Sequence, residues 1–261
     1  MTSRSSIAMM HREKLGDARR HLARVADAER TYIDSQPYRL LHAYDPRGGL
    51  YTVRVEVARG VPADIPVLAA SVVHEVRAAL DALAAELTSR GDGAAGAAPQ
   101  FPIHDSLPQF AQRSRRSLAT MADDAQATIE ALQPYHRLGG IRRDPLWLLR
   151  ELGSERPLRV APGALRGDTT LGVNTRRHVE ITGELQAKLG PFEHGATVVS
   201  VAAKVAGPDP KLDLYLRPSF ELALLRSGPA CGAPLRDTLG AICDYVDGEI
   251  FARLEGLLPA R

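Results

Sequence analysis

A chain of 261 residues with 44% hydrophobic and 25% charged residues has the composition of an ordinary globular protein and can bury a substantial core. Its net charge of +2 is too small to indicate nucleic-acid binding by itself. Two cysteines exclude a disulfide framework, and the sequence shows neither a signal-like segment nor an apolar run of membrane-spanning length. We therefore expect a cytoplasmic protein with no membrane segment.

The N-terminal half is predicted to be mostly helical, with one hairpin inserted into it. Residues 1–36 carry an apolar stripe at helical spacing and predict a long helix. In residues 37–60, two segments with the alternating pattern of strands flank "DPRGG", where a proline and two glycines favour a tight turn. This arrangement predicts a β-hairpin. Residues 61–156 form the helical part. Within it we expect helices at 64–89, 106–114, 117–132 and 144–152.

The C-terminal half changes to the period of strands. Residues 157–226 contain alternating segments such as "ATVVSVAAKV" and "KLDLYLRPSFELAL", which predict an antiparallel sheet with one apolar face. Residues 233–259 predict a closing helix. Because no βαβ alternation is present, the expected class is α+β. We expect residues 1–261 to form a single domain, since the apolar face of the sheet needs cover from the helices.

Two motifs that suggest a cofactor or a metal fail in their context. The spacing G-x-G-x-x-G occurs at 91–96, but it follows a helix and leads into Ala-Ala-Pro, whereas dinucleotide binding needs a strand before it and a helix after it. "HEVRA" begins like a zinc-protease helix, but Ala78 occupies the position of the second ligand. We predict neither a cofactor nor a metal. The basic pairs in "RSRRS", "IRRD" and "TRRH" favour solvated faces and leave RNA as a possible partner.

A polar triplet on the helix predicted at 64–89 is the main candidate site. His74, Arg77 and Asp81 fall within about 60° of one another around the helix axis, apart from its apolar stripe. An imidazole beside a guanidinium and a carboxylate can perform acid–base chemistry on a phosphodiester or acyl substrate. Alternatively, Arg77 and Asp81 form a structural ion pair at i,i+4 spacing, with His74 as a bystander. The structural interpretation is favoured, since many helices carry such triplets.

Several short motifs occur in the order and spacing of a family of unknown function common in actinobacteria. They are "PY" at 37–38, "VRAALDAL" at 76–83, "FPI" at 101–103, "QPY" at 133–135 and "PLWLLREL" at 145–152. Over roughly residues 37–160 the chain resembles that family, whose helix bears Arg-Ser-Ala-Leu-Asp-His and whose later motif reads Asp-Lys-His-Arg. The first motif is similar to the Arg-x4-His pattern of HEPN ribonucleases, which act without a metal.

The chain departs from this family at both motif histidines. Arg77 and Asp81 are retained, but Ala82 stands where the family has its first histidine. Leu158 replaces the second histidine, and Arg159 alone is retained from the later motif. Without an imidazole at either position, proton transfer near neutral pH needs another histidine. His74 is the first substitute, and two further histidines, His104 and His136, are weaker ones.

Three hypotheses follow from these residues. The first is a binding or interaction module without the chemistry of its family, acting with a protein partner or as a homodimer. The second is a metal-independent nuclease, or another phosphate-directed enzyme, that uses His74, Arg77, Asp81 and Arg159. The third is a small-molecule enzyme with a pocket between the helices and the sheet. The first is favoured because both motif histidines are lost.

Overall fold

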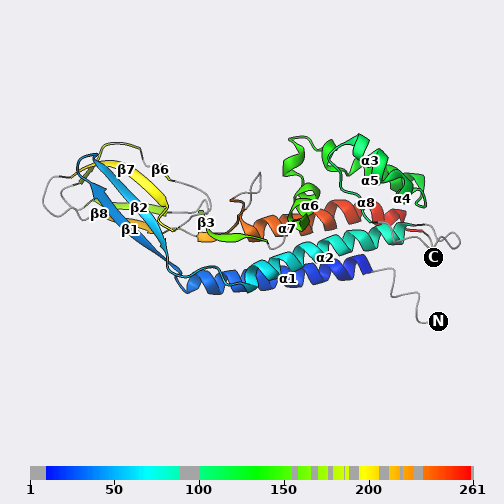
Figure 1. Cartoon of the computed structure of the whole chain (residues 1–261), viewed down its shortest axis with the longest axis horizontal. Coiled ribbons are helices and arrows are strands. Elements are labelled where there is room, and N and C mark those ends of the chain that lie inside the picture. Colours follow the sequence, from blue (N-terminus) through cyan, green and yellow to red (C-terminus); the bar gives the residue numbers. More distant parts are fainter. Residues whose placement is uncertain are drawn as a thin grey trace. The chain divides into compact units, whose positions relative to one another are not determined.

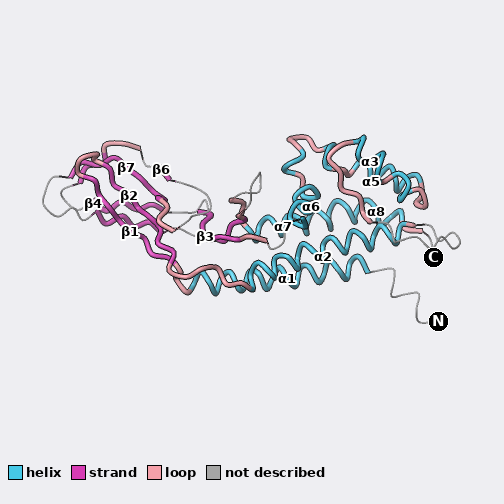
Figure 2. Tube along the Cα trace, in the orientation of Figure 1, coloured by secondary structure: helices cyan, strands magenta, loops and turns pink. Residues whose placement is uncertain are grey.

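The computed structural model describes residues 10–88, 100–154, 158–165, 170–175, 179–184, 186–187, 194–205, 212–217, 220–225 and 232–259. It divides into two compact units, between which the chain passes after residues 26, 65, 158 and 235. The helical unit comprises 1–26, 66–158 and 236–261, and the strand unit comprises 27–65 and 159–235. Figure 2 shows that helices and strands are segregated in this way. This division does not test the expected single domain, which stays a prediction.

The helical unit is built around three long helical segments that lie side by side (Figure 1). They are α1 (Met10–Asp34), α2 (Asp64–Leu87) and the C-terminal segment formed by α7 (Leu235–Tyr245), a π-helical turn (Val246–Phe251), α8 (Ala252–Leu254) and a 3-10 turn (Glu255–Leu257). Salt bridges cross between them: Lys14 to Glu75 at 3.1 Å, and Arg19 to Asp247 at 2.8 Å. The predicted closing helix is therefore confirmed, and it contains one π-helical turn, which has a larger diameter than an α-helical turn.

The apolar stripes of these helices form the core of the unit. The stripe of α2 is fully buried, because every one of its members is at most 2% exposed. Burying side chains of this size stabilises the fold by about 1.5–3 kcal/mol each. The buried stripe residues of α2 and of the C-terminal segment are Val72, Val76, Leu80, Leu83, Leu87, Leu235, Leu239, Ile242, Val246, Ile250 and Leu254.

Shorter helices complete this unit: α3 (Leu107–Arg113), α4 (Arg115–Leu118), α5 (Asp123–Ala131) and α6 (Pro145–Ser154), with 3-10 turns at Pro134–His136 and Ile141–Arg143. The single helix predicted at 117–132 is wrong, because α4 ends at Leu118 and α5 begins at Asp123. Between them Met121 is buried and makes an antiparallel bridge to Thr88. A continuous helix through Met121 is incompatible with this backbone pairing.

The strand unit contains a five-stranded antiparallel sheet. The predicted hairpin is confirmed as β1 (Tyr38–Asp45) and β2 (Leu50–Val57), which pair over eight residues around the turn. The sheet continues from β2 to β7 (Thr197–Val205) and then to β5 (Val179–Ile181), and β6 (Gln186–Ala187) also pairs with β7. The hairpin from the N-terminal half is thus part of the sheet predicted in the C-terminal half.

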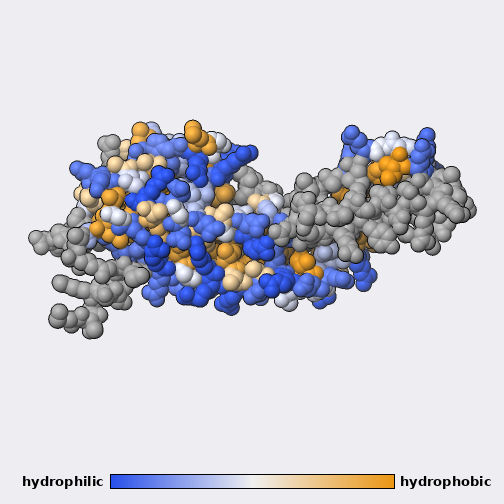
Figure 3. Space-filling view, turned by 180° about the vertical axis from the view of Figure 1, so that it is seen from behind, coloured by the Kyte–Doolittle hydropathy of each residue, from blue (hydrophilic) through white to orange (hydrophobic). Residues whose placement is uncertain are grey.

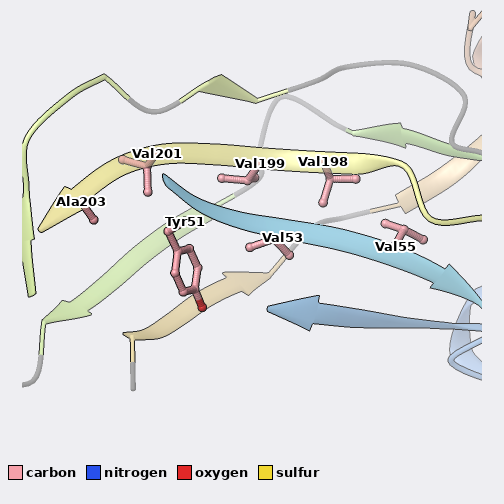
Figure 4. Close-up of a cluster of buried hydrophobic side chains, with 7 residues drawn as sticks. All are labelled: Tyr51, Val53, Val55, Val198, Val199, Val201 and Ala203. Atoms are coloured by element: carbon pink, nitrogen blue, oxygen red, sulfur yellow. The ribbon is translucent and has the colours of Figure 1, made fainter. Parts of the chain in front are cut away.

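A cluster of buried side chains from β2 and β7 forms the core of this sheet, and Figure 4 shows them on the two adjacent strands. Ile33 of α1, with Tyr38, Leu40 and Tyr44 of β1, packs against the cluster. Valine suits this position because its branched side chain fits a pleated surface. The members are Tyr51, Val53, Val55, Val198, Val199, Val201 and Ala203.

The alternating segment at 211–224 contributes two strands, each of which pairs with a different partner. β8 (Leu212–Arg217) pairs with β4 (Thr170–Thr175), while β9 (Phe220–Leu224) pairs with β3 (Val160–Leu165). Pro218 lies between them, and a proline lacks the N–H that a continuous ladder requires. The mixed helix-and-strand composition confirms the α+β class. On the face shown in Figure 3, hydrophobic residues of the helical unit form small separate groups among hydrophilic ones.

Candidate functional site

The Arg77–Asp81 pair predicted on α2 is formed, and it holds a third residue. Arg77 Nη2 lies 2.9 Å from Asp81 Oδ1, and Arg77 Nε donates to Asp81 Oδ2 at 3.2 Å. Arg77 Nη2 also donates to the carbonyl oxygen of Phe101 at 2.6 Å. The backbone N–H of Phe101 donates to Asp81 Oδ1 at 2.9 Å. Both backbone polar groups of Phe101 are therefore satisfied by this one pair of side chains.

Gln133 contacts the backbone of the residues that follow Phe101. Its side chain is only 2% exposed. The amide nitrogen Nε2 donates to the carbonyl oxygen of Pro102 at 2.9 Å, and Oε1 accepts from the backbone N–H of His104 at 3.0 Å. A buried amide with these contacts fixes both its own rotamer and the backbone that it touches.

Arg150 of α6 contacts residues 103 and 105. Arg150 Nη1 donates to the carbonyl oxygen of Ile103 at 3.4 Å, and Nη2 lies 2.7 Å from Asp105 Oδ1. Nη2 also donates to Glu151 Oε1 at 3.2 Å. The guanidinium therefore joins α6 to residues 103–105 through one backbone contact and one ion pair.

Residues 101–105 thus form a clamped segment without regular secondary structure. Phe101 and Ile103 are buried, at 0% and 6% exposure. Both backbone polar groups of Phe101 and the carbonyl oxygen of Ile103 are bonded to side chains in place of a helix or sheet. The clamping residues come from "VRAALDAL", "QPY" and "PLWLLREL", and the clamped residues include "FPI". Four of the five motifs that carry the family resemblance therefore meet at one structural feature; the fifth, "PY" at 37–38, lies at the start of β1.

A pocket of about 430 Å³ lies beside this clamp, between α2 and α6. Its apolar wall consists of Ala70, Val73, Leu149, Leu152 and Gly153. Its polar wall consists of His74, Arg77, Gln100, Arg150 and Ser154. The structure therefore brings His74 and Arg77 together in one concave surface, as their helical spacing predicts, and it adds the second arginine.

The two arginines of the pocket are already paired with carboxylates, yet each keeps unused donors. A guanidinium has five N–H donors. The contacts of Arg77 use Nε and Nη2, and the two N–H groups of Nη1 remain as donors. The contacts of Arg150 use Nη2 and one N–H group of Nη1, and the Nε–H and the other N–H group of Nη1 remain as donors. The pocket therefore offers hydrogen-bond donors without a large unbalanced charge.

His104 belongs to the clamped segment, and its ring is more enclosed than those of the other candidate histidines. Its Nε2 is 2.7 Å from the hydroxyl oxygen of Ser114, which is 4% exposed, and its ring packs edge-on to Phe110. Burial, followed by the positive charges of Arg113 and Arg150, lowers the pKa of His104. The imidazole is therefore neutral at neutral pH, and its contacts are structural.

His136 lies in an exposed ion pair. Its Nε2 is 2.7 Å from Glu130 Oε1, which also accepts from the Tyr135 hydroxyl at 2.8 Å. The hydrogen bond from His136 is the main cause of a lowered pKa of Glu130. His136 does not line the pocket that contains His74 and Arg77.

Arg159 belongs to the strand unit, whereas the other predicted site residues belong to the helical unit. Its side chain is exposed, and its carbonyl oxygen accepts from the Leu225 N–H at 2.8 Å. Leu158, which replaces the second motif histidine, is a core residue with 3% exposure. The G-x-G-x-x-G segment and "TRRH" lie largely or wholly outside the described residues.

Arg150, Gln133 and Gln100 are the residues that sequence reasoning missed. Gln133 lies in "QPY" and Arg150 in "PLWLLREL", so that the motifs of the family resemblance contain both residues but do not indicate what either contacts. Within the described ranges, there is no cluster of three metal-binding side chains and no helix with the length and apolar character to cross a bilayer. Comparison with models of known families, with curated proteins and with solved structures finds no match.

Proposed function

We propose that this protein is a non-catalytic binding protein whose pocket between α2 and α6 holds a small molecule with an oxyacid group, such as a carboxylate or phosphate. One observation carries the proposal: Arg77 and Arg150 line the same pocket, and each is fixed by contacts to the clamped segment. Fixed guanidinium donors lose little freedom on binding an oxyacid, and this pre-organisation favours affinity.

The rest of the pocket defines the body of the ligand. The wall formed by Val73, Leu149 and Leu152 is apolar, and it favours a hydrocarbon or aromatic group attached to the oxyacid. A volume of about 430 Å³ is within the usual range of small-molecule sites. His74 is exposed at this surface, so that it adds a donor or acceptor without being needed for the fold.

Binding is tested by isothermal titration calorimetry, with phenyl phosphate and benzoate as probes. Gly153→Leu places a side chain in the pocket, where a Cβ alone already lies 3.8 Å from Val73 Cγ1. We expect this variant to abolish the binding of the probe that the wild type takes up. Gly248→Leu is the matched control, because a Cβ at Gly248 meets nothing within 4 Å and Gly248 does not line the pocket. Equal binding by the two variants would refute the proposal.

Salt dependence separates this function from polyanion binding. Because Asp81, Asp105 and Glu151 already pair with the two arginines, recognition rests on short-range hydrogen bonds. We expect the probe affinity to change less than about threefold between 50 and 200 mM salt, whereas a protein contacting several RNA phosphates loses orders of magnitude. A steep salt dependence would contradict the small-molecule assignment.

A metal-independent nuclease is the second candidate, and it is favoured by the presence of His74 and Arg77 in one pocket. In that function His74 acts as the acid or base. The test is cleavage of RNA in the presence of chelator by the wild type and by His74→Ala, a substitution at an exposed position. Arg142→Ala, at an exposed arginine outside the pocket, is the control. Equal cleavage by wild type and His74→Ala would exclude this mechanism.

A further inference from the structure

Strand β1 forms one edge of the five-stranded sheet. Within the described part of the chain, the strand order starts at β1, and β2 is the strand with which it pairs. β1 is eight residues long, and its sequence "YRLLHAYD" contains neither lysine nor proline. Natural proteins usually protect a long edge strand with such residues, because its free N–H and C=O groups can pair with another strand.

The side chains of β1 divide into two sets by the strand period. Leu40 and Tyr44 face the core and are partly buried against it. Arg39, Leu41 and Asp45 are exposed on the other face, and Leu41 is 49% exposed. Among the described strands β1 therefore has a neighbour on one side, and its outer face carries an exposed leucine between two opposite charges, which suits an interface.

We propose that β1 pairs with β1 of a second copy of this chain, antiparallel and centred on His42, so that the two sheets join into one. In such a dimer the apolar face of one sheet must lie on the same side as the apolar face of the other. Since alternate residues of a strand lie on opposite faces, odd-numbered residues must oppose odd-numbered residues. The register centred on His42 meets this condition. It places Arg39 opposite Asp45 of the second copy twice, by symmetry, and Leu41 opposite Ala43.

The charges of β1 select this register over its neighbours. A shift by two residues in one direction places Arg39 opposite Ala43, and a shift in the other direction places it opposite Arg47. Within its own hairpin Arg39 is the cross-strand partner of Glu56. In the dimer Arg39 therefore lies between two carboxylates, one on each neighbouring strand, and such opposite-charge pairs stabilise a sheet.

The first test is the self-association constant, measured by sedimentation equilibrium for the wild type, Arg39→Gln and Asp45→Asn. Asparagine keeps an acceptor for the Arg47 N–H, which now donates to Asp45 Oδ1 at 3.0 Å, so that the turn is preserved. We expect each variant to dissociate about 2- to 30-fold more readily, and the double variant no more than the worse single one. Arg54→Gln, on β2 and away from the edge, is the matched control.

The second test reads the register directly by disulfide trapping. Opposed residues in an antiparallel pair have Cα atoms about 4.5–5.5 Å apart, a distance that a disulfide spans. His42→Cys should therefore crosslink to its own copy under mild oxidation. Leu41→Cys should not, because the two Leu41 Cα atoms lie about 8 Å apart in this register. A monomeric wild type, or crosslinking at Leu41→Cys as efficient as at His42→Cys, would overturn the proposal.

Discussion

Replacing Arg77 by alanine tests whether the polar triplet of α2 is a structural clamp. The substitution removes the hydrogen bond to the Phe101 carbonyl oxygen and leaves Asp81 without its cation. A hydrogen bond from a charged donor contributes about 1.5–3 kcal/mol. The ion pair adds at most about 0.5 kcal/mol, since its side chains are 31% and 30% exposed. We expect Arg77→Ala to lower the free energy of unfolding by about 1.5–3 kcal/mol.

The assay is urea unfolding followed by the fluorescence of Trp147, the single tryptophan, which lies in α6 of the helical unit. Asp81→Ala should cost a similar amount, because it removes the acceptor of the Phe101 N–H. The double variant should cost less than the sum, because both bonds hold the same residue.

Arg253→Ala is the control for this clamp. Arg253 forms an i,i+4 ion pair with Glu249 whose side chains are 56% and 46% exposed, and it bridges no backbone segment. We expect a loss below about 0.5 kcal/mol from its removal. If Arg77→Ala costs no more than Arg253→Ala, the pair on α2 does not clamp Phe101, and the structural interpretation fails.

Three further outcomes follow from the same contacts. Gln133→Ala should lower the unfolding free energy by about 2–4 kcal/mol in the same assay, because it leaves the buried carbonyl oxygen of Pro102 and the part-buried N–H of His104 without this partner; a loss below 1 kcal/mol, on the order of one ordinary hydrogen bond, would contradict it. Since burial lowers the pKa of His104, the unfolded chain binds a proton more readily, and stability present above about pH 6.5 is lost as the pH falls. His104→Gln should therefore lose less stability than the wild type between neutral and mildly acidic pH, and parallel curves would count against it. Burial raises the pKa of the Cys243 thiol to about 11, so that mass spectrometry after alkylation at pH 8, roughly the pH of standard thiol labelling, should find Cys243 unmodified until denaturant is added.

The sequence predicted elements well where periodicity was strong. The stripes of α2 and the C-terminal helix are regular and the hairpin has a recognisable turn, so that their predicted bounds lie within a few residues of the observed ones. The helix predicted at 1–36 agrees at its C-terminal end, at Asp34, and residues 1–9 lie outside the described part of the chain. The break near Met121 is not predicted, for a physical reason. Met121 pairs with Thr88, a residue more than thirty positions away, and the local pattern of residues 117–132 does not reveal such a contact.

The candidate site was predicted only in part. Local spacing on one helix is enough to place His74, Arg77 and Asp81 together, because i,i+3 and i,i+4 neighbours share a face. The role of the pair depends on Phe101, and the pocket depends on Arg150; both are distant in sequence. Helical spacing carries no information on such contacts.

The most direct test of the binding function is an NMR titration that follows the Nε–H signals of Arg77 and Arg150 as phenyl phosphate is added. The pocket model predicts saturable shifts of both signals, with one dissociation constant, because both guanidinium groups line the same pocket. The signal of Arg142, an exposed arginine outside the pocket, should not saturate. Shifts that do not saturate, or equal shifts at Arg142, would contradict the account.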